Sequence, residues 1–359
     1  MKKAMIAMSG GVDSSVAALL TLREGTEAIG GTMRLFDRAA VSPSEKVCGS
    51  HDDVQDAKGV CDRLGIGHFV FDMQEEFENA VMRRFADIYR RGDTPNPCIL
   101  CNRFVKFGGL LRRALNLGCD AVVTGHYARV AQDSSSGRWL LQKAVDTAKD
   151  QTYFLYGLNQ YQLAHTLLPL GTLTKPEVRR IAEENGFANA RRHDSQDICF
   201  IPDGDYVAFL ERFCGEHFPE GDFVDKEGQV IGHHKGTIRY TIGQRKGLGM
   251  GFNKPMYVCA KDVAARTVTL GDNADLFSRE VSARDINLIA IPRLNAPLRV
   301  IAKVRYSQRE EPALLEQTGE DALHLTFDRP QRAVAPGQAV VCYDADDGIT
   351  VIGGGTIVS

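Results

Sequence analysis

The chain has 359 residues, enough for two or three domains, because single hydrophobic cores seldom grow beyond roughly 250–300 residues. Hydrophobic residues make up 43% and charged residues 25%, and no apolar run approaches the ~20 residues that cross a bilayer, which excludes a helical membrane protein. The net charge of −3 gives no overall attraction to nucleic acid, and nine cysteines are too sparse for a secreted disulfide scaffold. With no export signal, we expect a cytoplasmic protein with reduced thiols.

The first predicted element is a short apolar strand, residues 4–8, which runs directly into a loop of glycine and serine, residues 9–15. A helix-like stretch, residues 16–22, follows at once. Glycines allow a tight turn and close approach to a ligand, and a helix N-terminus offers unpaired N–H groups to an anion. The loop lacks both the Gly-Lys-Ser/Thr ending of a Walker loop and the three-glycine dinucleotide fingerprint. It therefore predicts a phosphate or pyrophosphate site; the alternative is a tight glycine turn without a ligand.

Strand and helix patterns alternate over the first 204 residues. Short runs typical of strands lie at residues 4–8, 28–35, 68–73 and 120–126. Between them, apolar side chains recur every three or four residues, as in helices: Val54, Ala57, Cys61 and Leu64, then Phe77, Val81, Phe85 and Ile88. This alternation predicts an α/β fold, a doubly wound parallel sheet at residues 1–204. Ligands of such sheets bind at the carboxyl ends of the strands, where the glycine loop lies.

The pattern changes after residue 204. Residues 221–230 are charged and rich in turn formers, and from about residue 258 onward polar and apolar residues alternate with a period of two. Turn signals such as Pro336-Gly337 and Asp347-Gly348 separate the alternating runs. We expect a small linking domain at residues 205–270 and a C-terminal β-barrel domain at residues 271–359.

Residues 93–102 (Asp-Thr-Pro-Asn-Pro-Cys-Ile-Leu-Cys-Asn) contain a second informative pattern. Two prolines within three residues fix an extended turn, and Cys101 falls where a helical segment from Arg103 is predicted to begin. The pKa of a thiol at a helix N-terminus is lowered, because the helix dipole favours the thiolate. Cys199 lies just beyond a basic tract, residues 191–193, whose positive charge favours thiolate as well.

Two uses of these thiols are open. Cys98 and Cys101 have metal-ligand spacing, and Cys199 would supply a third thiolate, a set compatible with an iron–sulfur cluster. The alternative is a redox pair of Cys101 and Cys199 that works through persulfide and disulfide chemistry. For the remaining six cysteines we favour the role of small buried hydrophobic side chains: Cys48, Cys61, Cys119, Cys214, Cys259 and Cys342.

Six motifs, in chain order, are SGGVDSS, TPNPC-x2-CN-x3-KF, TGHYAR, KDQTYFLY, DSQDICFI and YTIGQRKGLG. Together they resemble the tRNA-specific 2-thiouridylases over nearly the whole chain. The first motif is similar to the pyrophosphate (PP) loop of the N-type ATP pyrophosphatases, which have an adenine nucleotide alpha-hydrolase-like fold. The resemblance implies an enzyme that uses ATP and Mg²⁺ to adenylate the wobble uridine of tRNA. Sulfur from a persulfide then replaces the 2-oxygen, and AMP and pyrophosphate are released.

The resemblance also implies roles for individual residues. Cys101 matches the nucleophile and Cys199 the carrier of the persulfide, and the reaction leaves these two joined in a disulfide. The positions around ATP are Ala7, Met8, Ser9, Gly10, Gly11, Val12, Asp13, Ser14, Met33 and Gly125. Those at the target base are Asn96, Pro97 and Cys98, and those that contact tRNA are Lys149, Asp150, Gln151, Arg305 and Tyr306. The implied partners are the anticodon stem-loop of tRNA and a persulfide-donating sulfur-relay protein or cysteine desulfurase.

One position departs from the family pattern. Many members carry Asp where this chain has Cys98, and a thiol is a poor substitute for a carboxylate as acid or base. The departure keeps a [4Fe–4S] version of the thiolation open, with Cys98, Cys101 and Cys199 as ligands. Two rival functions are another PP-loop ligase and a non-catalytic tRNA-binding protein with a structural cluster.

Two further features have alternative interpretations. Asp13 either organises a metal or the loop, or is an ordinary acid at a helix start. Residues 244–249 (Gln-Arg-Lys-Gly-Leu-Gly) offer donors and a flexible backbone for phosphate contact, or form a basic hairpin tip. We expect the linking domain and the barrel to clamp the anticodon stem.

Overall fold

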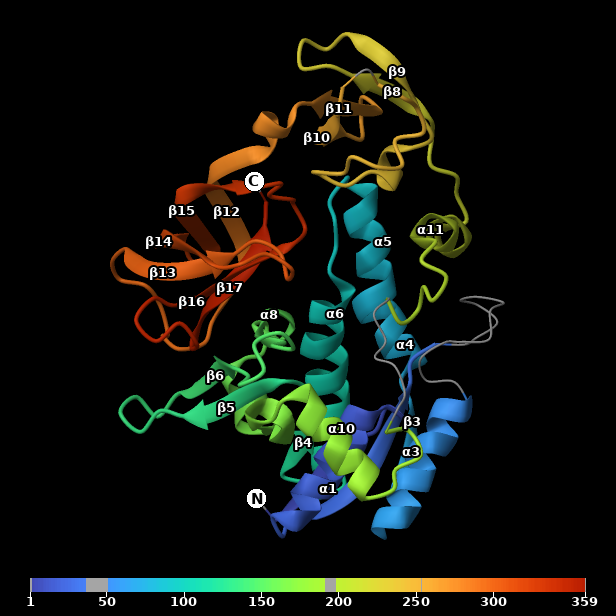
Figure 1. Cartoon of the computed structure of the whole chain (residues 1–359), viewed down its shortest axis with the longest axis vertical. Coiled ribbons are helices and arrows are strands. Elements are labelled where there is room, and N and C mark those ends of the chain that lie inside the picture. Colours follow the sequence, from blue (N-terminus) through green and yellow to red (C-terminus); the bar gives the residue numbers. More distant parts are fainter. Residues whose placement is uncertain (1, 37–50, 191–197, 253, 359) are drawn as a thin grey trace.

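A five-stranded parallel sheet is the centre of the first part of the chain in the computed structural model, which describes residues 2–36, 51–190, 198–252 and 254–358 (Figure 1). In spatial order its strands are β3 (His68–Asp72), β2 (Glu27–Arg34), β1 (Lys3–Ala7), β4 (Ala121–Val123) and β7 (Thr166–Leu167). The first three match the predicted strands to within one residue at each end. The fourth is shorter than the predicted 120–126, because residues 124–127 leave the sheet toward the glycine loop.

Side chains of β1 alternate between two apolar cores, so helices must cover both faces of the sheet. Ala4 and Ile6 belong to the core on one face, and Met5 belongs to the core on the other. The first face is covered by α1 (Val12–Arg23), α3 (His51–Leu64) and α10 (Lys175–Glu184). This arrangement confirms the predicted doubly wound α/β fold.

The second face is covered by two long helices, each with a π-helical middle. One consists of α4 (Gln74–Phe77), η1 (Glu78–Met82) and α5 (Arg83–Arg90). The other consists of α6 (Pro97–Leu100), η2 (Cys101–Leu110) and α7 (Leu111–Asn116). Segments of π-helix are rare and occur frequently at functional sites. The second helix carries the motif cysteines.

Smaller elements connect the sheet to the rest of the molecule. They are β5 (Ala128–Gln132), β6 (Trp139–Lys143), α8 (Thr152–Leu155), α9 (Gln160–Ala164) and η3 (Pro169–Thr172). The hairpin of β5 and β6 reaches the C-terminal part through a β-bridge between Gln142 and Thr350. No helix in the described part of the chain is both long and apolar enough to cross a bilayer.

A helix and a small sheet follow the first domain. The helix, α11 (Tyr206–Cys214), packs Phe209 and Leu210 into the same core as the long cysteine helix. The sheet has the order β10-β11-β8-β9 and a core of its own around Phe223 and Val268. Its elements are β8 (Gly221–Val224), β9 (Val230–His234), η4 (Thr237–Arg239), β10 (Tyr257–Asp262) and β11 (Thr267–Gly271).

Six antiparallel strands close into a barrel at the end of the chain, as predicted from the period-two pattern (orange to red in Figure 1). They are β12 (Phe277–Leu288), β13 (Leu298–Lys303), β14 (Glu311–Gly319), β15 (Ala322–Arg332), β16 (Ala339–Asp344) and β17 (Val351–Ile357), preceded by η5 (Asn273–Leu276). Alternate residues Leu323, Leu325 and Phe327 fill the barrel core. The barrel lies beside α8 and the hairpin of β5 and β6 (Figure 1).

Candidate active site

The loop between β1 and α1 is shaped for close contact between its backbone and a ligand. Gly10 has φ +75°, and a Cβ there would lie 2.8 Å from the carbonyl oxygen of Asp53. Gly11 is the N-cap of α1 and has no side chain with which to cap it, while the hydroxyls of Ser14 and Ser15 donate to its carbonyl oxygen at 2.9 and 3.0 Å. The first N–H groups of the helix are therefore left for an anion.

Asp13 is held by two side chains from other parts of the first domain. Both of its carboxylate oxygens accept hydrogen bonds from Nζ of Lys175 at 2.8 Å, and the hydroxyl of Tyr127 donates to it at 2.9 Å. Lys175 is nine-tenths buried at the first position of α10. The carboxylate thus ties the loop to α10, an organising role rather than that of a plain helix-start acid.

The residues expected around ATP lie at the carboxyl ends of three neighbouring strands. Residues 7–14 follow β1, Met33 lies near the end of β2, and Gly125 follows β4. A Cβ on Gly125 would lie 2.7 Å from the backbone carbon of Asp13, so only glycine permits this approach. The fold brings all the predicted ATP positions to one edge of the sheet.

The motif cysteines lie on a helix that begins earlier than predicted. Asn96 is the extended N-cap and Pro97 occupies the first turn, so the helix starts at Pro97 and not near Arg103. The prediction was wrong because proline at the first helical position fixes the φ that a helix needs. Cys98 is therefore in the first turn and exposed, whereas Cys101 is one turn further along and buried. Cys101 thus lacks the helix-terminal position on which its predicted thiolate character rested, and Cys98, which has that position, has a raised thiol pKa.

Cys101 and Cys199 belong to one apolar core. Cys101 is a buried member of the core that contains Phe77, Phe200 and Val122, and Cys199, partly exposed, packs against the same core. Neither cysteine forms a disulfide. The structure therefore gathers the two predicted catalytic thiols on the face of the sheet that carries the cysteine helix.

The three motif cysteines do not assemble a metal site. Among the described residues, which include Cys98, Cys101 and Cys199, no group of three Cys, His, Asp or Glu side chains could hold a metal ion. Cys98 is exposed to solvent while Cys101 is buried in the core. This donor set does not fit an iron–sulfur cluster.

Polar side chains lie close to Cys98 along the same helix. Asn102, one helical turn further along, is buried and donates from Nδ2 to the carbonyl oxygen of Phe154 at 3.1 Å. Its Oδ1 is buried without a hydrogen-bond partner in the described part of the chain. Although Cys98 is exposed at the surface, the protein around it partly desolvates the thiol and raises its pKa, and the positive charge of Lys106 opposes that shift.

The imidazole of His126 follows Gly125 directly. Its Nδ1 lies 2.7 Å from the hydroxyl of Thr124, and burial, with a smaller contribution from the charge of Lys106, holds its pKa well below the usual value. The imidazole is therefore neutral near pH 7. Lys106 thus acts electrostatically on a group at the ATP edge and on Cys98.

Comparison with known proteins decides the family. Residues 2–203 match the model described as tRNA methyl transferase HUP domain, residues 207–272 that of the tRNA methyl transferase PRC-barrel domain, and residues 278–357 that of the aminomethyltransferase beta-barrel domain. The chain is 49% identical to tRNA-specific 2-thiouridylase MnmA of Clostridioides difficile, covering 99% of this chain and 98% of that protein. It is 47% identical to the protein of the same name from Acetivibrio thermocellus, covering 99% of each. The chain belongs to the tRNA-specific 2-thiouridylase family.

In this 2-thiouridylase family member, the predicted tRNA positions of the KDQ motif are mostly turned toward protein. Asp150 is buried and accepts hydrogen bonds from the backbone of Ala144 and the hydroxyl of Thr152. Gln151 accepts from the backbone N–H of Tyr127 through its side-chain oxygen. Lys149 is half-buried beside them. The carboxylate of Asp150 therefore serves the protein's own packing, and tRNA contact by this motif stays a prediction.

The two barrel positions differ from each other. Arg305 donates to the backbone carbonyl oxygens of Ala333 and Ile242, so its guanidinium joins the barrel to the linking sheet. Tyr306 is exposed, and its ring packs against Phe154 with centroids 4.4 Å apart. Of the two, Tyr306 is the one whose aromatic ring is exposed, as stacking on an RNA base requires.

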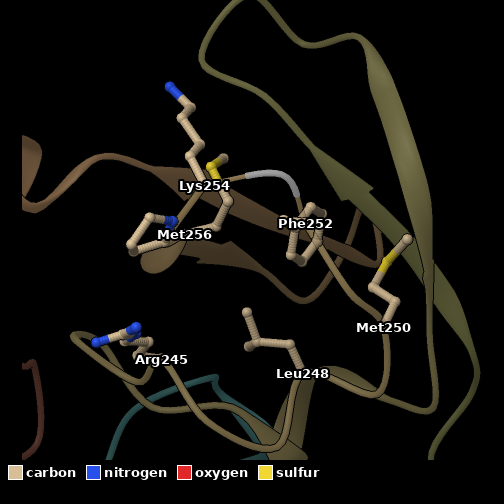
Figure 2. Close-up of a pocket in the computed structure, with 7 residues that line it drawn as sticks. Arg245, Leu248, Met250, Phe252, Lys254 and Met256 are labelled. Atoms are coloured by element: carbon tan, nitrogen blue, oxygen red, sulfur yellow. The ribbon is translucent and has the colours of Figure 1, made fainter.

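The predicted phosphate-contact loop, residues 244–249, contributes to a pocket of about 310 Å³ (Figure 2). Leu248, Met250, Phe252 and Met256 supply apolar walls, and Arg245 and Lys254 supply positive charge. Figure 2 shows Arg245 and Lys254 on the same side of the pocket, away from Met250. The pocket thus combines the two kinds of contact that RNA offers, bases and phosphates.

Some predictions fall outside the described residues. The basic tract at 191–193, invoked for the thiolate of Cys199, and Cys48 are among them. Of the other cysteines, Cys61, Cys119 and Cys342 are buried as expected, whereas Cys214 and Cys259 are partly exposed.

Sequence reasoning missed two residues that hold the loop, Lys175 and Tyr127. The sequence does contain a signal for the position of Lys175: Thr174 and Glu177 form a capping box, which indicates that Lys175 is the first residue of a helix. Nothing in the sequence marks Asp13 as its partner, 162 residues away.

Proposed function

We propose that this chain is a tRNA-uridine 2-sulfurtransferase that adenylates the wobble uridine of tRNA and then replaces its 2-oxygen with sulfur. The observation that carries the proposal is the occurrence, in one domain, of an anion-binding PP loop and two thiols that share a core. Membership in the 2-thiouridylase family and relatives at 47–49% identity over the full chain support it. Because tRNA is the proposed substrate, we assign the reaction to the cytoplasm.

ATP is the proposed source of energy, bound at residues 7–14, Met33 and Gly125. The N–H groups at the start of α1 and the hydroxyl of Ser9 would bind its β- and γ-phosphates. Mg²⁺ would be held mainly by the phosphates themselves, because the carboxylate of Asp13 is already paired with Lys175. There the ion would shield phosphate charge.

Adenylation solves the chemical difficulty of the reaction. A uracil carbonyl is a poor electrophile and its oxygen is a poor leaving group. Attack of the uridine O2 on the α-phosphate forms an O–P bond and releases pyrophosphate. AMP then becomes the leaving group, and the former O2 departs with it. Lys106, which acts electrostatically on both Cys98 and His126, is suited to balance the negative charge of the departing phosphate.

Sulfur transfer uses the two thiols in turn. Cys199 carries a persulfide loaded by a sulfur-donor protein, and the thiolate of Cys101 attacks the inner sulfur, that of Cys199. A Cys101–Cys199 disulfide forms and hydrosulfide leaves. Hydrosulfide adds to C2 of the adenylated uridine and displaces AMP. An external thiol must then reduce the disulfide before the next cycle.

The base must leave the anticodon loop to reach the site. Unstacking one loop base costs a few kcal/mol, far less than opening a duplex. We assign the base position to Asn96, Pro97 and Cys98, at the start of the cysteine helix. The linking-domain pocket of Figure 2, with Arg245 beside apolar walls, and the exposed ring of Tyr306 are suited to contact the rest of the stem-loop.

The proposal is tested with protein purified anaerobically and analysed for iron, then loaded with persulfide sulfur. We expect the iron-free protein to form 2-thiouridine in an unmodified tRNA transcript only when ATP is present, with release of pyrophosphate. Thiolation confined to iron-loaded samples would overturn the persulfide scheme. Pyrophosphate release without any thiolated nucleoside would point instead to another PP-loop ligase.

A further inference from the structure

The segment between α5 and α6 is held by the C-terminal barrel. The backbone N–H of Thr94 donates to the carbonyl oxygen of Pro336 at 2.8 Å. In return, Nε2 of Gln338 donates to the carbonyl oxygens of Thr94 at 2.9 Å and Pro95 at 3.2 Å. Three hydrogen bonds thus join a barrel turn to the chain that leads into the cysteine helix (Figure 1).

Gly337 permits this close approach. Its φ is +86°, and a Cβ there would lie 2.9 Å from each of three atoms: Cβ of Asp93 and the backbone nitrogen and oxygen of Thr94. Such distances are too short for any side chain, and two of the three atoms are backbone. Gly348, in another barrel turn, also has a positive φ of +67°, but the nearest atom to its Cβ position is 3.9 Å away. Of these two turn glycines, Gly337 is the one that is pressed against the first domain.

The turn that carries Gln338 is itself fixed to the barrel. Gly337 donates its N–H to the carbonyl oxygen of Ile357 at 2.9 Å, and Ile357 donates back to Gln338 at 2.8 Å. The next residue, Ala339, accepts a hydrogen bond from the buried hydroxyl of Tyr153 at 2.9 Å. Gln338 therefore extends from a rigid support rather than from a free loop.

The carbonyl groups that Gln338 binds lie very close in sequence to the proposed base position. Only Asn96 and Pro97 separate the Pro95 carbonyl from Cys98, and both prolines have restricted φ. A shift of the Pro95 carbonyl would therefore be transmitted to the first turn of α6. Displacements of about 1 Å near a reacting group can reduce rate about 100-fold.

We propose that Gln338 is a positioning residue for the thiolation reaction, through which the barrel sets the place of Asn96, Pro97 and Cys98 against the target base. The inference rests on the proposed function, because it assumes that these residues receive the base. It assigns the barrel a part in catalysis in addition to tRNA contact. The contacts of the PP loop in the described residues lie within its own domain, at Asp53, Lys175 and Asn189, so pyrophosphate chemistry itself should be assembled without this turn.

The test compares Gln338→Met with wild type in steady-state thiolation of a tRNA transcript. Methionine keeps the length of glutamine and removes both hydrogen bonds to the segment. We expect kcat to fall about 10- to 100-fold while the KM values for tRNA and ATP stay within about threefold. Gln331→Met is the matched control: Gln331 is a buried barrel glutamine, Gln338 is partly exposed, and in the described part of the chain the Gln331 amide donates to a carbonyl oxygen of the barrel itself, that of Arg329.

A second pair of variants keeps the test independent of Gln338. Gly337→Ala should reduce kcat at least as strongly as Gln338→Met. Gly348→Ala also replaces a glycine of positive φ, but its Cβ would not be forced against a neighbour, so kcat should stay within about twofold of wild type. Gln338→Glu, which has the shape of glutamine but no donor when ionised, should not restore the rate.

The outcomes separate this inference from the proposed function. If wild type thiolates tRNA while Gln338→Met keeps wild-type kcat, or changes only the KM for tRNA, the positioning role is wrong. If wild type forms no thiouridine, the proposed function fails first. A loss of kcat shared equally by Gln331→Met would also overturn the inference, because it would reflect general damage to the barrel.

Discussion

The PP loop and the segment that leads into the cysteine helix are built in different ways. In the described residues the loop is held by its own domain: Asp53 lies against Gly10, Lys175 pairs with Asp13, and Asn189 donates to the carbonyl oxygen of Gly10. Residues 92 and 93 are still hydrogen-bonded to α5, but Thr94 and Pro95 are held from outside, by the barrel turn at 336–338. Under the proposed function, activation of ATP is thus a property of one domain, whereas presentation of the target base depends on how the domains meet.

The largest expected effect separates the two chemical steps. Cys199→Ser removes the proposed persulfide carrier, so thiolation should fall by about 10³-fold or more, while tRNA-dependent pyrophosphate release in a single turnover should persist. Mass spectrometry of digested tRNA and a pyrophosphate assay on the same sample measure both. Cys259→Ser, at a partly exposed cysteine of the linking sheet, is the control and should behave as wild type. Thiolation at an undiminished rate in Cys199→Ser would contradict the scheme.

The second largest effect is expected from a substitution in the PP loop, which should impair the use of ATP but not the binding of tRNA. Gly10→Ala forces a Cβ against the Asp53 carbonyl at a positive φ, which should displace the loop and slow pyrophosphate release about 100-fold without weakening tRNA binding. Gly25→Ala has a similar φ of +79° but nothing within 4 Å, and should retain activity. Filter binding of labelled tRNA provides the second readout. Equal losses in both variants would mean that backbone strain alone, and not the loop, is responsible.

A smaller effect sharpens the role of Asp13. Lys175→Met leaves the carboxylate with Tyr127 and no cation, so we expect the KM for ATP to rise about 10-fold and the unfolding free energy to drop by about 1–3 kcal/mol. Lys226→Met removes an ion pair with Asp275 whose lysine is more than half exposed, and should leave the unfolding free energy almost unchanged. An unchanged KM for ATP in Lys175→Met would show that the pair does not organise the loop.

The smallest effect concerns the far side of the segment, where Lys261 of β10 faces Asp93. Burial lowers the pKa of Lys261 to about 8, and the charge of Asp93 opposes that shift. A lysine in the unfolded chain titrates near 10.4. Between these two pKa values the unfolded chain binds more protons at Lys261 than the folded chain does. The free energy of unfolding therefore rises with pH across this window, because the cost of burying the charged lysine disappears.

Lys261→Met isolates that contribution. From pH 7 to pH 10 the difference in unfolding free energy should shift in favour of wild type by about 1–3 kcal/mol. Urea unfolding at matched pH values measures it. A difference that is flat across the window would mean that Lys261 titrates normally and is not buried at the junction.

The sequence predicted what is encoded locally. Glycine and serine after an apolar strand specify the loop by backbone chemistry, and period-two alternation specifies the barrel strands. The cysteine helix begins at Pro97, earlier than predicted, because proline is favourable at the first helical position. Its first turn therefore contains Cys98 rather than Cys101.

What the sequence did not predict depends on contacts between distant residues. Asp150 in a polar motif suggests a surface contact, but its burial follows from packing against the barrel, where Thr152 lies 3.1 Å from Tyr343. The guanidinium of Arg305 donates its hydrogen bonds to backbone carbonyl oxygens, one of them 63 residues away in the sequence. Gln338 had no signal at all beyond the turn that precedes it, since its partners lie 244 and 243 residues away.

The most direct test of the central claim follows the oxygen that sulfur replaces. A transcript with ¹⁸O at position 2 of the wobble uridine is incubated with ATP and the persulfide-loaded protein, and the AMP is analysed by mass spectrometry. Adenylation before sulfur transfer predicts one ¹⁸O in each AMP and one thiouridine for each AMP released. Unlabelled AMP alongside thiouridine would contradict the account.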